Sequence, residues 1–214
     1  MELDVAQLTR AQRYKLLTSL VVPRPIALVT TLTEGGIVNA APFSFFNVVG
    51  DDPPLIMISA DARTDGEMKH TVRNILANKQ FVVNLVDEAI AEKMHGAAVE
   101  APSEMSEIDL VGFTTAPSQR IRPPRIAESP ISFECELHTD LDFNARRLLI
   151  GQILWIHTRD GIIDPTNLRR LPNTYFPVGR LYANRYCRTR DEFALDNSRY
   201  AEAAIKFGKG KFTE

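Results

Sequence analysis

Apolar runs of strand length, separated by turn residues, fill much of the chain. The segment IALVTTL from Ile26 is β-branched and apolar, and the prolines of VVPRP just before it exclude a helix there. Gly35 and Gly36 can take positive φ, and GIVNAAPFSFFNVV then resumes as extended chain. The two segments are predicted to form a β-hairpin, with an edge or an interruption at Pro42.

One clear helix interrupts these strands. From Met68, apolar residues recur at i, i+4, i+7 and i+8, so residues 68–78 are predicted to be helical. A turn at residues 51–54, DDPP, separates two of the extended segments. Other segments of strand character are LIMISA, FVVNLV, ISFECELH and RLLIGQILWIHT, and the last two are predicted to pair as a second hairpin.

The remaining segments carry weaker signals. Residues 8–20 have loosely helical apolar spacing, and residues 87–98 are a second predicted helix. Residues 114–130 contain four prolines, which predicts an irregular surface passage that wraps or covers a neighbouring part. Residues 199–214 are predicted either to dock or to extend away. Many short strands with little βαβ alternation favour a small antiparallel barrel, mainly β with helical additions.

Charge and cysteine content narrow the class of protein. The 25 basic and 27 acidic residues leave a formal charge of −2, so no global field attracts nucleic acid or an anionic membrane. Cys135 and Cys187 form no CxxC motif, which argues against a disulfide framework or a zinc ribbon. The segment MELDVAQLTRAQRYKLL lacks the apolar core of a signal peptide. We therefore expect a cytoplasmic protein without nucleic-acid or membrane partners.

The commonest catalytic motifs are absent from the sequence. The four histidines show no metal-ligand spacing such as HExxH, and no carboxylate pair stands out as an acid/base dyad. GxSxG, GxxxxGK[ST] and GxGxxG are also missing, which removes the usual signatures of serine hydrolases, nucleotide triphosphatases and Rossmann dehydrogenases. No side-chain nucleophile and no metal site is indicated.

A cationic and polar cluster, KHTVRN, lies at the front of the clearest helix. Helix N-termini present unpaired N–H groups and a partial positive charge, so a lysine there is mildly unfavourable unless an anion lies nearby. Lys69 is therefore a candidate phosphate-binding residue. The alternative is that residues 64–67, TDGE, form a capping box, so that the helix starts earlier and Lys69 is a solvated second-turn residue.

The segment NAAPFSFFN combines small residues, a proline, aromatic rings and polar groups. Small side chains let backbone N–H groups approach a flat ligand, and a planar heterocycle needs an apolar slot with a few placed donors and acceptors. The segment is therefore a candidate ring-binding site. The alternative is an ordinary strand with a bulge.

Six segments in this order form a recognisable pattern: RPIALVTT, NAAPFSFFN, LIMIS, KHTVRNI, FVVNLV and VGRLY. Together they resemble the flavin reductase-like family, which includes nitrilotriacetate monooxygenase component B, flavoredoxins and reductases of two-component monooxygenases. The resemblance implies a six-stranded antiparallel split β-barrel, dimeric, with one FMN per subunit at the dimer interface. It divides the chain into an N-terminal helical extension (1–20), an FMN-binding domain (21–190) and a tail (191–214).

The resemblance also implies which residues contact FMN. Lys69 and Thr71 match the family's phosphate-binding lysine and threonine, and Asn74 lies close by on the first turn. His70 stands where relatives commonly carry aspartate, so its backbone N–H is the implied contact. The other implied contacts are the ring-lining residues Asn39, Ala40, Ala41, Pro42, Phe43 and Ser44, then Ser59 near the ribityl chain, Arg24 near the flavin or the nicotinamide, and Arg180 of the VGR motif.

The implied activity is that of an NAD(P)H:flavin reductase. NADH or NADPH delivers hydride to the flavin, and reduced FMN or its electrons pass to a partner such as a monooxygenase. An FMN-binding electron carrier without NAD(P)H oxidase activity has the same fold and is the alternative; the placement of residues 117–130 and of the tail decides whether the flavin face is open to nicotinamide. A third hypothesis is a pyridoxamine phosphate oxidase relative or a haem-binding member of the same barrel class.

Overall fold

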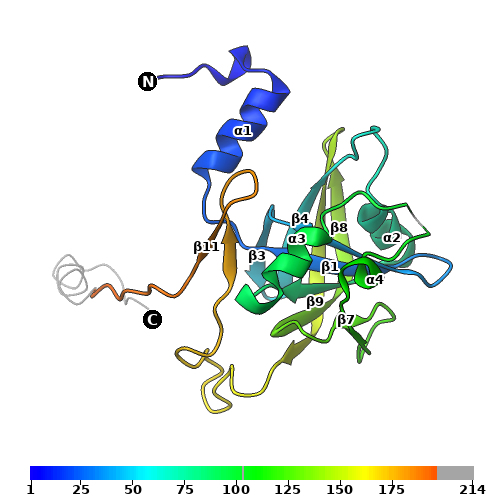
Figure 1. The fold of residues 1–214 in the computed structure, drawn as a ribbon, viewed down its shortest axis with the longest axis vertical. Coiled ribbons are helices and arrows are strands. Elements are labelled where there is room, and N and C mark those ends of the chain that lie inside the picture. Colours follow the sequence, from blue (N-terminus) through cyan, green and yellow to red (C-terminus); the bar gives the residue numbers. More distant parts are fainter. Residues whose placement is uncertain (103, 197–214) are drawn as a thin grey trace.

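The computed structural model describes residues 1–102 and 104–196, so most of the predicted tail lies outside the described residues. The main sheet is antiparallel and consists of β1 (Ala27–Leu32), β2 (Val38–Phe43), β3 (Phe46–Asp51), β4 (Pro54–Asp61), β5 (Gln80–Leu85), β8 (Ile131–Asp142) and β9 (Arg146–Thr158). Its seven strands follow the order β2-β1-β5-β8-β9-β4-β3. Figure 1 labels β1, β3, β4, β8 and β9 of this sheet. The protein is therefore mainly β, as predicted.

Shorter elements surround this sheet. Two small strand pairs are β6 (Thr115–Ala116) with β7 (Arg125–Ile126), and β10 (Val178–Arg180) with β11 (Tyr186–Arg188). The helical elements are η1 (Val5–Gln7), α1 (Arg10–Leu20), α2 (His70–Asn78), η2 (Glu88–Ile90), α3 (Ala91–Gly96) and α4 (Glu107–Val111). Across the described ranges, none of these helices combines the length and the apolar character needed to span a bilayer.

The two edge strands of the sheet, β2 and β3, are consecutive in the chain, with Ser44 and Phe45 between them. One extended segment thus supplies both edges and brings them together at its bend, where Ser59 N donates to Phe45 O at 2.8 Å. Within the described residues no ladder pairs β2 with β3, so the barrel is split. The strand count differs from the predicted six because the segment GIVNAAPFSFFNVV is divided at this bend.

Both predicted hairpins are confirmed. Between β1 and β2, Thr33 N donates to Ile37 O at 2.9 Å, and Gly36 has a φ of +83°. The hairpin of β8 and β9 is longer than predicted, since its strands extend to Asp142 and restart at Arg146. Gly151 on β9 leaves room for the fully buried Phe81 ring, because a Cβ atom there would lie 2.4 Å from Phe81 Cζ.

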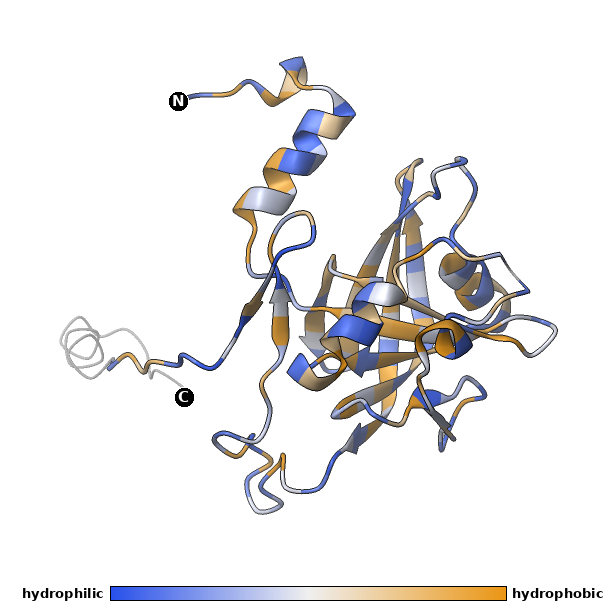
Figure 2. Ribbon diagram, viewed as in Figure 1, coloured by the Kyte–Doolittle hydropathy of each residue, from blue (hydrophilic) through white to orange (hydrophobic). Residues whose placement is uncertain are grey.

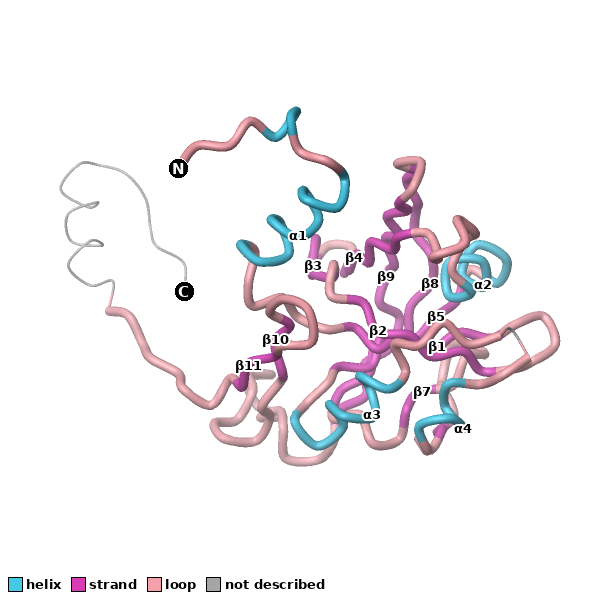
Figure 3. Tube along the Cα trace, turned by 45° about the horizontal axis from the view of Figure 1, so that its top comes forward, coloured by secondary structure: helices cyan, strands magenta, loops and turns pink. Residues whose placement is uncertain are grey.

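The strand β1 is buried on both faces, which explains its continuous apolar sequence. Val29 points into a cluster inside the barrel that α2 closes through Val72 and Ile75. Leu28 points into a second cluster, which α3 joins through Met94 and to which α4 also contributes. Figure 3 shows α2 apart from α3 and α4 around the strands, and Figure 2 shows apolar stretches along the barrel strands.

The helical predictions hold with changed bounds. The helix predicted at 8–20 begins at Arg10, where Thr9 and Gln12 form a capping box. The second helix predicted at 87–98 is shorter, consisting of η2 and α3. Short α4 and the strand β11 were not predicted. Their sequences, EIDLV and YCR, are too short to show a period of either kind.

The proline-rich passage at 114–130 is more tightly packed than predicted. Ile126 on β7 is fully buried. The carboxylate of Glu134, itself 0% exposed on β8, accepts hydrogen bonds from the backbone N–H groups of Gln119 at 2.6 Å and Arg120 at 2.7 Å. His157 Nε2 lies 2.6 Å from the same carboxylate. The passage is therefore fixed against β8 and β9 by a buried charge. It covers neighbouring strands as predicted, but it is packed, whereas its prolines predicted an irregular surface passage.

Candidate functional site

A pocket opens where β2 bends into β3. It has a volume of about 190 Å³ and is lined by Tyr14, Ala41, Pro42, Phe43, Ser44, Phe45, Ser59, Asp61, Lys69, Ala97, Ala98, Val99 and Arg146. We call it the β2 pocket. Several of these residues also line an adjoining hollow of about 250 Å³ that includes Arg24 and Arg180. Residues predicted from three separate segments, at 41–44, 59 and 69, therefore meet at one site.

The helix α2 points an uncapped N-terminus toward this site. It begins at His70, its N-cap residue Lys69 makes no side-chain capping hydrogen bond, and its first turn has no acidic residue. Gly66, with a φ of +88°, and the bond from Arg63 N to Glu67 O place the preceding residues in a turn. The predicted start at residue 68 and the capping-box alternative are therefore wrong. An unpaired helix N-terminus with a lysine at its cap favours a bound anion.

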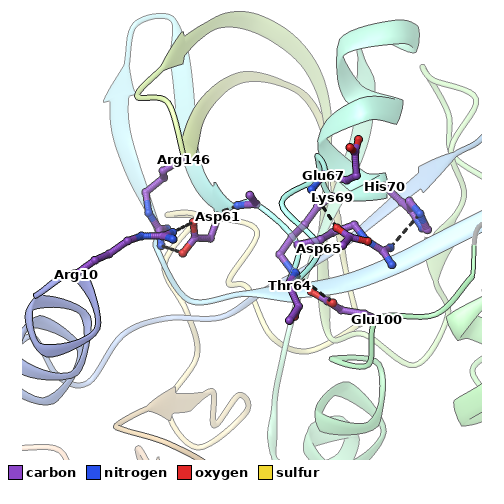
Figure 4. A network of polar contacts seen from close by, with 11 residues as sticks. Arg10, Asp61, Thr64, Asp65, Glu67, Lys69, His70, Glu100 and Arg146 are labelled. Carbon is purple, nitrogen blue, oxygen red and sulfur yellow. Dashed lines mark hydrogen bonds and ion pairs between the residues drawn. The ribbon is translucent and has the colours of Figure 1, made fainter.

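Glu100 is the carboxylate next to Lys69 (Figure 4). Lys69 Nζ lies 3.4 Å from Glu100 Oε1, and Thr64 N donates to Glu100 Oε2 at 3.4 Å. The hydrogen bond with Thr64 and the charge of Lys69 hold the pKa of Glu100 below its usual range. Glu100 is therefore charged at neutral pH and competes with any incoming anion for Lys69.

The imidazole of His70 accepts a hydrogen bond from a neighbouring arginine. Arg63 Nη1 donates to His70 Nε2 at 3.0 Å, and Arg63 Nε also donates to Asp65 at 3.3 Å. Burial, together with the charges of Arg63 and Arg73, lowers the pKa of His70, so the ring is neutral. Arg63 thus occupies the Nε2 atom of His70. The group that His70 presents at the helix N-terminus is its backbone N–H.

Three of the predicted contacts, Asn39, Thr71 and Asn74, hold α2 against the sheet and do not line the β2 pocket. Asn39 Nδ2 donates to Thr71 Oγ1 at 2.9 Å, and Asn74 Nδ2 donates to Thr31 Oγ1 at 3.0 Å. All three predicted residues are buried. Their side chains therefore position the N-terminus of α2, and Thr71 presents its backbone N–H there.

The outer edge of β2 is covered by α4. Ser106 Oγ donates to Val38 O at 2.6 Å, and Ala40 N donates to Glu107 Oε2 at 3.0 Å. Glu107 is 4% exposed, and burial raises the pKa of its carboxyl group despite the hydrogen bond from Ala40. Ala40, which was predicted as a ring contact, thus has its backbone held by α4. The residues that follow it on β2 line the pocket.

The two predicted arginines lie beside the β2 pocket, with most of their donors bound to protein groups. Arg24 is 8% exposed and donates to the carbonyls of Thr18, Val21 and Leu181 at 2.6, 2.8 and 2.7 Å. Arg180 donates to the Tyr186 hydroxyl and to the Ala183 carbonyl. Both residues line the adjoining hollow, where they tie α1 and the β10–β11 pair to the start of β1.

Arg146 is a pocket residue that the sequence analysis missed. It is the first residue of β9, its guanidinium lies 4.5 Å from the centroid of the Phe45 ring, and it donates to Ser59 O at 3.2 Å. It also pairs with Asp61 at 3.1 Å. The antiparallel register of β4 and β9 places Arg146 opposite Asp61. No local sequence signal connects positions this far apart in the chain, so only the pairing of the strands reveals the contact.

Comparisons with known proteins agree with this fold. Residues 19–189 match the model of the flavin reductase like domain. A protein of Aquifex aeolicus is 42% identical over 195 residues, which cover 91% of this chain and 99% of the relative.

Two solved structures are similar over nearly their full lengths. 2-Nitrobenzoate 2-nitroreductase NbaA of Pseudomonas fluorescens has a TM-score of 0.85 at 42% identity, covering 92% of this chain and 95% of that one. Nitrilotriacetate monooxygenase component B of Bacillus cereus has a TM-score of 0.85 at 32% identity, covering 91% and 98%. The resemblance found in the sequence is confirmed, and the chain belongs to the flavin reductase like family.

Proposed function

We propose that the β2 pocket binds FMN, with its phosphate at the N-terminus of α2 and its ring along residues 41–44. The observation that carries this proposal is the uncapped N-terminus of α2, with Lys69 at its cap, beside a pocket lined by extended backbone. Backbone N–H groups, the helix dipole and a lysine together suit a phosphate dianion. Small residues at Ala41 and Ser44 suit the close approach of a flat ring.

The residues around the β2 pocket fit this cofactor in charge and shape. Ser59 and Arg146 supply a hydroxyl group and a fixed cation on the wall formed by β4 and β9. Phe45 and Tyr14, whose ring centroids are 6.4 Å apart, supply apolar surface. Asn39, Thr71 and Asn74 act indirectly, by fixing α2 against the sheet. This arrangement binds and orients a flavin without requiring a side-chain nucleophile.

The proposed activity is NAD(P)H-dependent flavin reduction that supplies reduced flavin or electrons to a partner such as a monooxygenase. When bound, the flavin supplies the hydride-accepting and electron-donating chemistry. Family membership and the likeness to a monooxygenase component B support this activity. Residues 117–130 pack against β5 and β8 and line neither the β2 pocket nor its adjoining hollow, which supports open access for nicotinamide.

A second candidate is the reduction of a nitroaromatic acid by the bound flavin, and the observation that favours it is the 42% identity to a 2-nitrobenzoate 2-nitroreductase. An FMN-binding electron carrier remains the alternative without NAD(P)H oxidase activity. These functions share one cofactor site. They differ in which molecule donates electrons to the flavin and which accepts them.

Anaerobic mixing of the FMN-loaded protein with NADH, and separately with NADPH, distinguishes these functions. The reductase predicts loss of the visible flavin absorbance at a rate on the order of 1 s⁻¹ or faster. Re-oxidation of the reduced protein by 2-nitrobenzoate, compared with benzoate, then tests the nitroreductase. If dithionite bleaches the flavin but neither nucleotide does, the carrier function replaces the reductase. A protein that does not bind FMN contradicts the site.

The proposed assembly is a homodimer with FMN at its interface, in a reducing cytoplasmic setting that the free thiols of Cys135 and Cys187 support. Exposed apolar side chains on β3 support a partner surface, since Val48 is 61% and Val49 49% exposed. Light scattering during size-exclusion chromatography should give twice the mass of one chain. A monomeric mass for the FMN-loaded protein would contradict the dimer.

A further inference from the structure

A large open cleft lies between α1 and the barrel, next to the β2 pocket. Its volume is about 770 Å³, and its lining residues are Arg10, Ala11, Arg13, Tyr14, Leu17, Phe45, Asp61, Ala62, Arg63, Thr64, Phe143, Ala145 and Arg146. We call it the α1 cleft. The proposed FMN site, at the N-terminus of α2 and along residues 41–44, leaves most of this cleft unassigned.

Positive charge predominates among the residues that line the α1 cleft. They include four arginines and one carboxylate, Asp61. Arg10 lies 2.5 Å and Arg146 3.1 Å from the two oxygens of this carboxylate, so two guanidinium groups share one negative charge (Figure 4). Arg13 donates to the carbonyl of Leu8, a neutral partner, and within residues 1–102 and 104–196 it forms no ion pair. Guanidinium groups bind carboxylates and phosphates through paired hydrogen bonds.

The walls of the α1 cleft are apolar and largely aromatic. Tyr14, Phe45 and Phe143 contribute rings, and Leu17 adds an aliphatic side chain. Phe143 is 58% and Leu17 55% exposed, so both present apolar surface to a ligand. The guanidinium of Arg146 lies over the Phe45 ring, which holds one cation at the boundary between the apolar wall and the charged region. Such walls favour a flat ring over a compact inorganic anion.

The α1 cleft adjoins the β2 pocket. Tyr14, Phe45, Asp61 and Arg146 line both of them. A molecule in the cleft can therefore place its ring beside a flavin in the β2 pocket and its charged end against the arginines of α1.

We propose that the α1 cleft binds an aromatic anion, a flat ring carrying a carboxylate or phosphate group, through Arg10 and Arg13 with Arg146 at the inner end. The role of this ligand as the reaction partner of the flavin rests on the proposed function. The binding itself does not, because every residue named belongs to the folded chain. A free aryl carboxylate and a nicotinamide dinucleotide both present this chemistry, and the test separates them.

The test compares benzoate with its uncharged amide, benzamide, on the FMN-loaded protein, with perturbation of the flavin spectrum as the readout. Benzoate should bind about tenfold more tightly than benzamide, because its carboxylate accepts one more charge-assisted hydrogen bond from the arginines. The double variant Arg10→Gln/Arg13→Gln should remove this preference. The matched control is Lys15→Gln, which removes a positive charge from α1 outside the cleft lining and should keep the preference.

The KM for NADH, measured on the same proteins, identifies the source of the anion. A change in benzoate affinity alone indicates an aryl acid, and an increase in the KM for NADH indicates the dinucleotide. Two results overturn the proposal when the KM for NADH is also unchanged. One is equal binding of benzoate and benzamide, and the other is a preference for benzoate that survives in the double variant. Calorimetric titration of the flavin-free chain with benzoate tests the α1 cleft independently of the FMN site. Benzoate should bind to the cleft even if the β2 pocket does not bind FMN.

Discussion

Replacement of Lys69 by alanine should weaken FMN binding by about tenfold to a hundredfold, because a charge-assisted hydrogen bond contributes roughly 1.5–3 kcal/mol. The reason is the position of Lys69 at the N-cap of α2, where it makes no side-chain capping hydrogen bond. Without the lysine, the helix N–H groups and dipole bind the phosphate alone. Fluorescence titration of the FMN-free protein with FMN measures the change.

Riboflavin, which lacks the phosphate, is the matched control ligand for this variant. Its affinity should be the same for the wild type and for Lys69→Ala. The variant Glu100→Gln gives the opposite change, because it removes the competing carboxylate 3.4 Å from Lys69. Since an exposed ion pair is worth at most about 1 kcal/mol, FMN affinity should rise by up to about fivefold. Equal losses of FMN and riboflavin affinity in Lys69→Ala would show that Lys69 acts on the ring or on the fold.

Replacement of Glu134 by alanine should lower the free energy of unfolding by about 3–5 kcal/mol, because each buried donor left without its acceptor costs roughly 1–3 kcal/mol and Glu134 is the acceptor for three groups. The carboxylate is 0% exposed and serves His157 and two backbone N–H groups of the passage at 114–130. All three groups lose their acceptor in the variant. Thermal unfolding should then occur about 6–20 °C lower.

The pH dependence of stability gives a control for Glu134. Burial raises the pKa of this carboxyl group, but the hydrogen bonds with His157, Gln119 and Arg120 outweigh burial and hold it below its usual range. Its contribution to the free energy of unfolding is therefore complete above the ordinary carboxyl pKa of 4.5 and is lost as the pH falls from there through the folded-state pKa.

Urea unfolding of the wild type and of Glu134→Gln, compared across this pH range, measures that contribution. Glutamine keeps one acceptor oxygen and nearly the same volume, so the difference between the two proteins isolates the charge. The difference should shrink as the pH falls. A difference that grows on acidification would mean that the charged form is not the stabilising one.

Local sequence patterns predicted much of the sheet. The glycines at 35 and 36 specify the first hairpin turn, and the continuous apolar run of IALVTTL matches a strand buried on both faces. The cationic start of α2 was also visible in the sequence. The first residue of α2 could not be predicted in the same way. It follows a turn at Gly66 that is closed by the hydrogen bond from Arg63 N to Glu67 O, and the 3.6-residue period does not encode this backbone geometry.

The candidate site was predictable only in part. The segment at 41–44, Ser59 and Lys69 were identified because they lie in recognisable motifs, and the structure brings them together. Asn39, Thr71 and Asn74 lie in the same motifs, yet their side chains bond to one another and to Thr31. A motif specifies residue types at given spacings, and it does not specify which of them a neighbouring strand will engage.

Local patterns were enough to predict the strands of the main sheet, the main helices and the family, because alternation, turn residues and short motifs act over a few neighbouring positions. The tertiary structure alone decided that β2 and β3 form opposite edges of one sheet, that Arg146 lies opposite Asp61, and that Glu134 anchors the passage at 114–130. These contacts join residues far apart in the chain. Their energy depends on burial and strand register, which arise only when the whole barrel is assembled.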